Sequence, residues 1–120
     1  MGRTILIVDD DSRNIFALSA VLRAKEFDTI SASGMNEAFA LLNKHKDIGI
    51  VLLDIMMPEM DGLEAIPALK SEHKNIPVIA VTAQAMKGDR ERCIEAGADD
   101  YIPKPVDVDL LLKILNEHLK

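Results

Sequence analysis

Short, uninterrupted apolar runs recur along this chain, and they are the feature that most constrains its fold. The three clearest runs are Ile5–Val8, Ile50–Leu53 and Pro77–Val81. Runs of this length are typical of strands that are buried on both faces, as in a parallel sheet. Two weaker strands are predicted at Thr29–Ala32 and Asp100–Ile102.

Segments with a helical spacing of apolar residues separate these strands. In the first segment, Ile15, Leu18 and Leu22 share one face, to which Val21 and Phe16 are added. The expected helices span Arg13–Lys25, Met35–His45, Leu63–Glu72 and Lys87–Ala96, with a last one that begins at Asp107 or Asp109. Strand and helix therefore alternate five times. This alternation predicts an α/β fold, a five-stranded parallel sheet in the flavodoxin-like order 2-1-3-4-5 with five helices on both faces.

The composition narrows the class of protein. A length of 120 residues predicts a single domain, residues 1–120. The net charge of -6 argues against nucleic-acid binding through this domain, and it fits a cation site or a basic partner surface. No apolar run reaches the length of a membrane span, so no membrane partner is expected. The single cysteine, Cys93, rules out an intramolecular disulfide and fits a reducing compartment, and we expect a cytoplasmic protein.

Polar residues stand at the C-terminal ends of the predicted strands. They are Asp9, Asp10, Asp54, Thr82 and Lys104. Because parallel strands end at the same edge of a sheet, we expect these side chains to converge there. Crowded carboxylates repel one another, and some take up protons unless a cation is present. A compact set of oxygen ligands suits Mg2+, so we expect a magnesium site.

The charges of this site fit a phosphoryl group. If Asp54 accepts one, its own charge is consumed in the mixed anhydride. Asp9 and Asp10 then contribute about -2 and the phosphoryl group about -2, against roughly +2 from the metal and +1 from Lys104. Thr82 can donate its hydroxyl to a phosphoryl oxygen. The pattern indicates phosphoryl transfer with a carboxylate as the nucleophile.

The same residues give the chain its resemblance to a known family. It resembles the receiver domains of two-component response regulators, the superfamily of the bacterial chemotaxis regulators. The resemblance covers residues 4–118 and rests on Asp9-Asp10, on Asp54 within LLDIMMPEMDG, on Thr82-Ala83, on Tyr101 and on Lys104-Pro105. The segment from Thr82 to Asp107 resembles receivers attached to hybrid histidine kinases more than those of DNA-binding regulators, which favours one domain of a longer protein.

The resemblance implies a set of roles. Asp54 would be phosphorylated by a phosphohistidine donor, and Thr82 with Tyr101 would form a switch pair. Lys104 would contact the phosphoryl group, and the Lys104-Pro105 peptide bond would be cis. The expected ligands of Mg2+ are Asp9, Asp10, Asp54 and the backbone carbonyl of Met56.

It also implies partners and a limited kind of catalysis. The expected partner is a histidine kinase or a histidine phosphotransfer protein that docks near the first helix, and a phosphorylation-dependent homodimer is a further expectation. The domain would not be a conventional enzyme, since it would catalyse only its own phosphorylation and slow autodephosphorylation.

Two alternatives stay open on the sequence. Asp9-Asp10-Asp11-Ser12 also suits a metal-dependent phosphatase of the haloacid-dehalogenase type, in which Asp9 would be the nucleophile. A pseudo-receiver that acts only as a binding module is the second alternative. The aspartate that becomes modified distinguishes the receiver from the phosphatase, and Mg2+ binding tests the pseudo-receiver.

Two other groups of residues have simpler explanations. Asp11 or Ser12 is expected to cap the first helix, in preference to a role for Asp11 in the metal site. For His45, His73 and His118, which lie near helix ends, a charge interaction with the helix dipole is favoured over metal binding.

Overall fold

Five strands form one parallel sheet in the order β2-β1-β3-β4-β5. The computed structural model describes residues 4–55, 62–82 and 89–119 of the chain. The strands span Thr4–Val8 (β1), Thr29–Ala32 (β2), Ile48–Asp54 (β3), Val78–Thr82 (β4) and Asp100–Pro103 (β5). The predicted fold class and strand order are confirmed.

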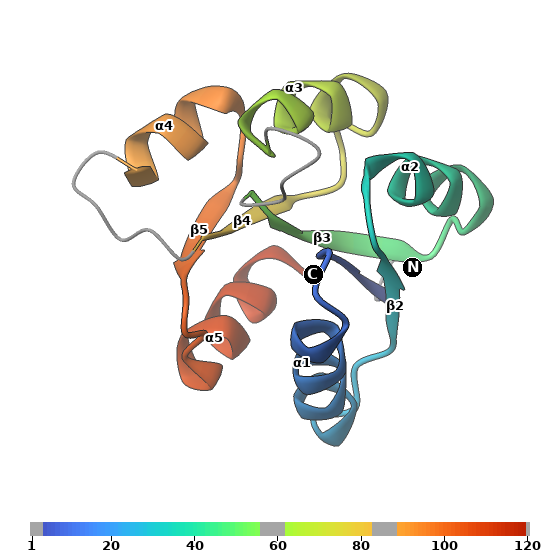
Figure 1. Cartoon of the computed structure of the whole chain (residues 1–120), viewed down its shortest axis with the longest axis vertical. Coiled ribbons are helices and arrows are strands. Elements are labelled where there is room, and N and C mark those ends of the chain that lie inside the picture. Colours follow the sequence, from blue (N-terminus) through green and yellow to red (C-terminus); the bar gives the residue numbers. More distant parts are fainter. Residues whose placement is uncertain (1–3, 56–61, 83–88, 120) are drawn as a thin grey trace.

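The helices cover both faces of the sheet. They span Ser12–Ala24 (α1), Met35–Lys44 (α2), Gly62–Glu72 (α3), Asp89–Ala96 (α4) and Val108–His118 (α5). Figure 1 shows α1 and α5 on one face and α2, α3 and α4 on the other. Within the described part of the chain, no helix is both long and apolar enough to cross a membrane.

The apolar strands supply a core on each face. Because successive residues of a strand point to opposite sides, Val51 and Leu53 of β3 face α2, α3 and α4. Ile50 and Leu52 of the same strand face α1 and α5. All four side chains are at most 1% exposed. A strand that is buried on both sides has no polar face, which explains the uninterrupted apolar run in the sequence.

Local signals fix the ends of the helices. Asp11 caps α1, as predicted, because its carboxylate accepts a hydrogen bond from the backbone N–H of Arg13. Asp107 caps α5 in the same way. Gly97 follows α4 at φ 117°, and the next N–H, that of Ala98, donates to the carbonyl of Cys93. This left-handed turn favours glycine and stops the helix as expected.

One boundary differs from the prediction in a way that matters for the site. The third strand was expected to end at Leu53, but Asp54 is its last residue and pairs with Val81 of β4. The carboxylate of Asp54 is therefore carried by the sheet itself and not by the following loop.

Neighbouring leucines of α5 test which face of this helix is packed. Leu111 is 1% exposed, whereas Leu110 is 38% exposed. We expect Leu111→Ala to lower the free energy of unfolding by about 2–5 kcal/mol, because it leaves a cavity in the core. Leu110→Ala should stay within about 0.5 kcal/mol of wild type, since alanine suits a helix at least as well as leucine. Urea denaturation measures both variants, and equal losses would contradict this packing.

Candidate functional site

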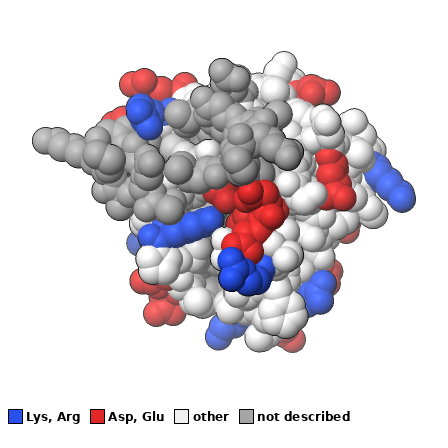
Figure 2. Space-filling view, in the orientation of Figure 1, with Lys and Arg blue, Asp and Glu red and all other residues white. Residues whose placement is uncertain are grey.

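Three carboxylates meet at the edge of the sheet where β1 and β3 end. The ligand oxygens of Asp9, Asp10 and Asp54 all lie within 4.8 Å of one another. Asp9 and Asp54 are 3% and 5% exposed, whereas Asp10 is open to solvent. Figure 2 shows acidic side chains gathered near the middle of this side of the molecule. The structure therefore brings Asp54 together with Asp9 and Asp10, which lie more than 40 residues earlier in the sequence.

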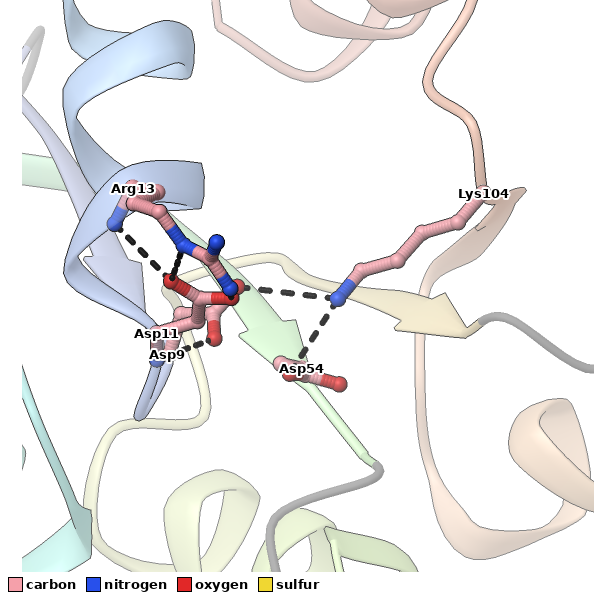
Figure 3. A network of polar contacts seen from close by, with 5 residues as sticks. All are labelled: Asp9, Asp11, Arg13, Asp54 and Lys104. Carbon is pink, nitrogen blue, oxygen red and sulfur yellow. Dashed lines mark hydrogen bonds and ion pairs between the residues drawn. The ribbon is translucent and has the colours of Figure 1, made fainter.

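Lys104 reaches this cluster from the end of β5. Its ammonium nitrogen lies 3.2 Å from Oδ2 of Asp54 and 3.6 Å from Oδ2 of Asp9. Figure 3 shows the extended side chain of Lys104 pointing between the two carboxylates. The backbone N–H of Lys104 donates to the carbonyl of Thr82 at 2.7 Å, which extends the pairing of β4 with β5. The Lys104-Pro105 bond is cis, as the resemblance implied.

The backbone fixes the orientation of Asp9. The N–H of Asp11 donates to Oδ1 of Asp9 at 2.9 Å, which leaves Oδ2 to face Lys104. Burial raises the pKa of Asp9, and the negative charge of Asp54 adds to this effect. The hydrogen bond from Asp11 and the charge of Lys104 oppose it. Asp9 therefore favours its neutral form more than an exposed aspartate does.

Asp11 belongs to the first helix and not to the acid cluster. Its two oxygens accept hydrogen bonds from the backbone and the guanidinium of Arg13. Those side-chain and backbone hydrogen bonds lower the pKa of Asp11. Figure 3 shows this pair beside Asp9, with Arg13 turned toward Asp11.

Thr82 and Tyr101 lie on the opposite side of the sheet edge from the acids. Thr82 ends β4 and is 1% exposed, and Tyr101 is half-buried on β5. Tyr101 pairs with Ala80, two residues before Thr82, so both side chains point toward α2, α3 and α4. Met56, the remaining predicted site residue, lies outside the described residues, as does Ala83.

The ligand set fits a hard divalent cation. Asp9, Asp10 and Asp54 offer only carboxylate oxygens, and three carboxylates with one ammonium carry a formal charge of about -2. Oxygen ligands at the ends of two neighbouring strands suit Mg2+, which needs few protein ligands. The donor chemistry therefore agrees with the magnesium site expected from the sequence.

The sequence analysis assigned Phe16 to the packed face of α1, which is wrong. Phe16 is 76% exposed. Its position directly follows Ile15, and adjacent helical residues point about 100° apart. Phe16 is thus out of phase with the spacing of Ile15, Leu18 and Leu22, and that phase was the signal that could have identified it.

An apolar groove between α1 and the start of α5 was also missed by the sequence analysis. It encloses about 510 Å³ and is lined by Asn14, Ala17, Leu18, Val21, Lys104, Pro105, Val106 and Val108. Lys104 belongs to both the groove and the acid cluster. A molecule that occupies the groove is therefore adjacent to the carboxylates.

Comparison with known proteins identifies the family. The family model of the response regulator receiver domain matches residues 5–116. The chain belongs to this family. Receiver domains of two-component systems are typically phosphorylated and use Mg2+, in agreement with the acids found here.

Two curated relatives carry this domain in different settings. The polar-differentiation response regulator DivK of Brucella anthropi is 37% identical, over 99% of this chain and 98% of the relative. Hybrid signal transduction histidine kinase I of Dictyostelium discoideum is 36% identical, over 96% of this chain but 7% of the relative. The chain is thus about as similar to a response regulator of nearly its own length as it is to the receiver part of a hybrid kinase.

A solved complex shares the fold. The complex contains the histidine phosphotransfer protein Ypd1 of Saccharomyces cerevisiae and the receiver domain of its downstream response regulator Ssk1. The match has a TM-score of 0.87 at 23% identity and covers 98% of this chain and 88% of the other. At this identity the likeness concerns the fold alone.

The raised pKa of Asp9 leads to a prediction about stability. An acid whose pKa is raised by folding destabilises the protein increasingly as the pH rises from its ordinary pKa through the folded one, because the unfolded chain releases its proton first. Without divalent cations, Asp9→Asn should therefore raise the melting temperature at pH 7, and this gain should shrink toward pH 4. The exposed Asp28→Asn serves as the control and should change little.

Added Mg2+ should reverse this order. The wild type should gain stability by binding the cation at the predicted site, whereas Asp9→Asn lacks one of the predicted ligands. Differential scanning calorimetry with and without Mg2+ measures both effects. A wild type that melts above Asp9→Asn in EDTA at pH 7 would contradict the assignment of Asp9 as an electrostatically unfavourable buried acid.

Proposed function

We propose that this domain is the phospho-accepting receiver of a two-component phosphorelay, with Asp54 as the acceptor. The observation that carries the proposal is the environment of the Asp54 side chain. It is 5% exposed, shares a 4.8 Å cluster with Asp9 and Asp10, and lies 3.2 Å from the ammonium group of Lys104. Acids and a cation placed in this way suit transfer of a phosphoryl group by positioning and electrostatics.

The proposed reaction forms one bond and breaks another at phosphorus. A carboxylate oxygen of Asp54 attacks the phosphorus of a phosphohistidine, the P–N bond breaks, and the donor imidazole leaves with the bonding electron pair and takes up a proton. The product is an aspartyl phosphate. Lys104 stands where it can neutralise a phosphoryl oxygen, and Thr82 supplies a hydroxyl donor at the end of β4.

The acids of the site serve the cation. Asp9, Asp10 and Asp54, with the backbone carbonyl of Met56, would hold Mg2+. When bound, Mg2+ neutralises negative charge on the carboxylates and on the incoming phosphoryl group. The N–H of Asp11 fixes the orientation of Asp9 through Oδ1, so that Oδ2, which faces Lys104, would take this role.

Phosphorylation would be reported by Thr82 and Tyr101. Both point to the same face of the sheet, from the neighbouring strands β4 and β5. A phosphoryl group that draws the Thr82 hydroxyl inward leaves space beside it, which the ring of Tyr101 would fill. That movement biases the surface of the last two strand–helix units between two arrangements.

The groove beside Lys104 is the proposed docking place for the donor. It is apolar, lies between α1 and α5, and has the exposed Phe16 on the same helix. A histidine kinase or histidine phosphotransfer protein that covers this groove would bring its phosphohistidine next to the acids. The complex of Ypd1 with the receiver of Ssk1 shows that a related fold binds a phosphotransfer protein.

Several finer expectations stay predictions. They are the cytoplasmic location, the single domain over residues 1–120, the phosphorylation-dependent homodimer, the slow autodephosphorylation and the absence of nucleic-acid and membrane partners. The family match favours the receiver over the first alternative, the haloacid-dehalogenase phosphatase. The pseudo-receiver is addressed by the experiment that follows.

Asp54→Asn tests the acceptor directly. With Mg2+ and the small donor phosphoramidate, we expect the wild type to gain one acid-stable but base-labile phosphoryl group, observed by intact mass spectrometry. Asp54→Asn should gain none, because an amide cannot act as the nucleophile. The exposed Asp28→Asn is the matched control and should be phosphorylated like the wild type.

The position of the modified residue separates the alternatives. Borohydride trapping followed by peptide mapping should identify Asp54. Modification of Asp9 would support the phosphatase, and a wild type that binds Mg2+ but gains no phosphoryl group would support the pseudo-receiver.

Phe16→Ala tests the docking place. Phe16 lies outside the groove lining, but it is a large aromatic side chain exposed on α1, the helix near which the partner is expected to dock. Its loss should slow transfer from a phosphohistidine protein by at least about tenfold relative to uptake from phosphoramidate. Leu110→Ala, an exposed apolar position on α5 and not on α1, is the control. Equal effects on both donors would place the docking surface elsewhere.

A further inference from the structure

A second group of potential metal ligands lies at the opposite end of β5 from Lys104. Asp100 opens this strand, and Glu117 and His118 lie in the last turn of α5. One ligand atom from each of the three residues falls within 4.8 Å of the others. A strand rises about 3.3 Å per residue, so the backbone of Asp100 lies roughly 13 Å from that of Lys104, the β5 end of the acid site. The two groups are therefore separate.

The distances between the ligands suit a metal ion. Nε2 of His118 lies 3.3 Å from Oδ2 of Asp100. Two ligand atoms that each bind a metal at about 2.1 Å, at angles of about 90–109°, are roughly 3.0–3.4 Å apart. The other oxygen of Asp100 accepts the N–H of Tyr101 at 2.9 Å, which holds the carboxylate in this orientation. Asp100 and His118 could thus bind one ion with little movement.

The third ligand and the helix end add to this arrangement. Within the part of the chain that the structure describes, the carboxylate of Glu117 makes no hydrogen bond or ion pair and is exposed to solvent. Glu117 and His118 belong to the C-terminal turn of α5, where the helix dipole favours a cation, and Asp100 lies beside them. With a neutral imidazole, two carboxylates carry a formal charge of about -2, which matches a divalent ion.

We propose that Asp100, Glu117 and His118 form a binding site for a divalent transition metal ion of the Zn2+ class. An imidazole nitrogen with two carboxylate oxygens suits Zn2+, Co2+ or Ni2+, whereas Mg2+ prefers oxygen ligands alone. Three protein ligands leave a further position for water. The bound ion ties the end of α5 to the start of β5.

A zinc titration tests this site in the full chain. The background is the double variant Asp9→Asn/Asp54→Asn, which removes two ligands of the acid site. Competition with a chromogenic chelator should show one equivalent of Zn2+ bound to this background, and millimolar Mg2+ should not displace it. Replacement of one of three ligands, by His118→Gln, Asp100→Asn or Glu117→Gln, should weaken Zn2+ binding at least about tenfold. His45→Gln, a histidine at the end of α2 outside this group, is the matched control.

Two further measurements keep the result independent of folding defects. The ring nitrogens of His118 should shift in NMR spectra when Zn2+ is added to the unaltered chain, and Zn2+ should raise the melting temperature of the background variant by a few degrees. Adding His118→Gln to the background variant should abolish this rise in melting temperature. The proposal is overturned if the background variant binds no Zn2+, or if its affinity is the same with and without His118→Gln.

Discussion

The parallel pairing of β1 with β3 is the constraint on which the rest of the site depends. Val8 pairs with Leu53, so the next residues along the two strands, Asp9 and Asp54, arrive side by side at the same edge of the sheet. A shift of one residue in this register would turn one carboxylate into the opposite core. The apolar residues of both strands are buried on both faces, and they therefore hold the two acids together even though like charges repel.

That repulsion is reduced by groups from other parts of the chain. Lys104 brings a positive charge within 3.2 Å of Asp54, and the N–H of Asp11 holds Asp9. These contacts do not restore the ordinary pKa of Asp9, because burial outweighs them. Under the proposed function the site would gain stability from a cation, because a bound ion would offset the repulsion between the acids.

The sequence was sufficient for the sheet order and for the acids, since apolar runs that end in aspartate report strands and their tips together. It also predicted Lys104 at the same edge, but the distances from its ammonium group to Asp54 and Asp9 come only from the structure. It also failed for Phe16, whose hydrophobic character suggested the core although its helical phase did not. For His118, the sequence analysis expected a charge interaction with the helix dipole. The contact of His118 with Asp100 of β5 could not be predicted, because it depends on how α5 packs against the sheet.

The alternation of side chains along the strands separates two tasks at one edge. Asp54 follows Leu52 by two positions, and Lys104 follows Ile102 by two, so both belong to the face of α1 and α5, where the apolar groove lies. Thr82 and Tyr101 belong to the other face, with α3 and α4. Under the proposed function, a donor docks on the first face while the conformational response is expressed on the second. Only the strand tips connect the two faces, and a phosphoryl group on Asp54 would stand there, within reach of both Lys104 and Thr82.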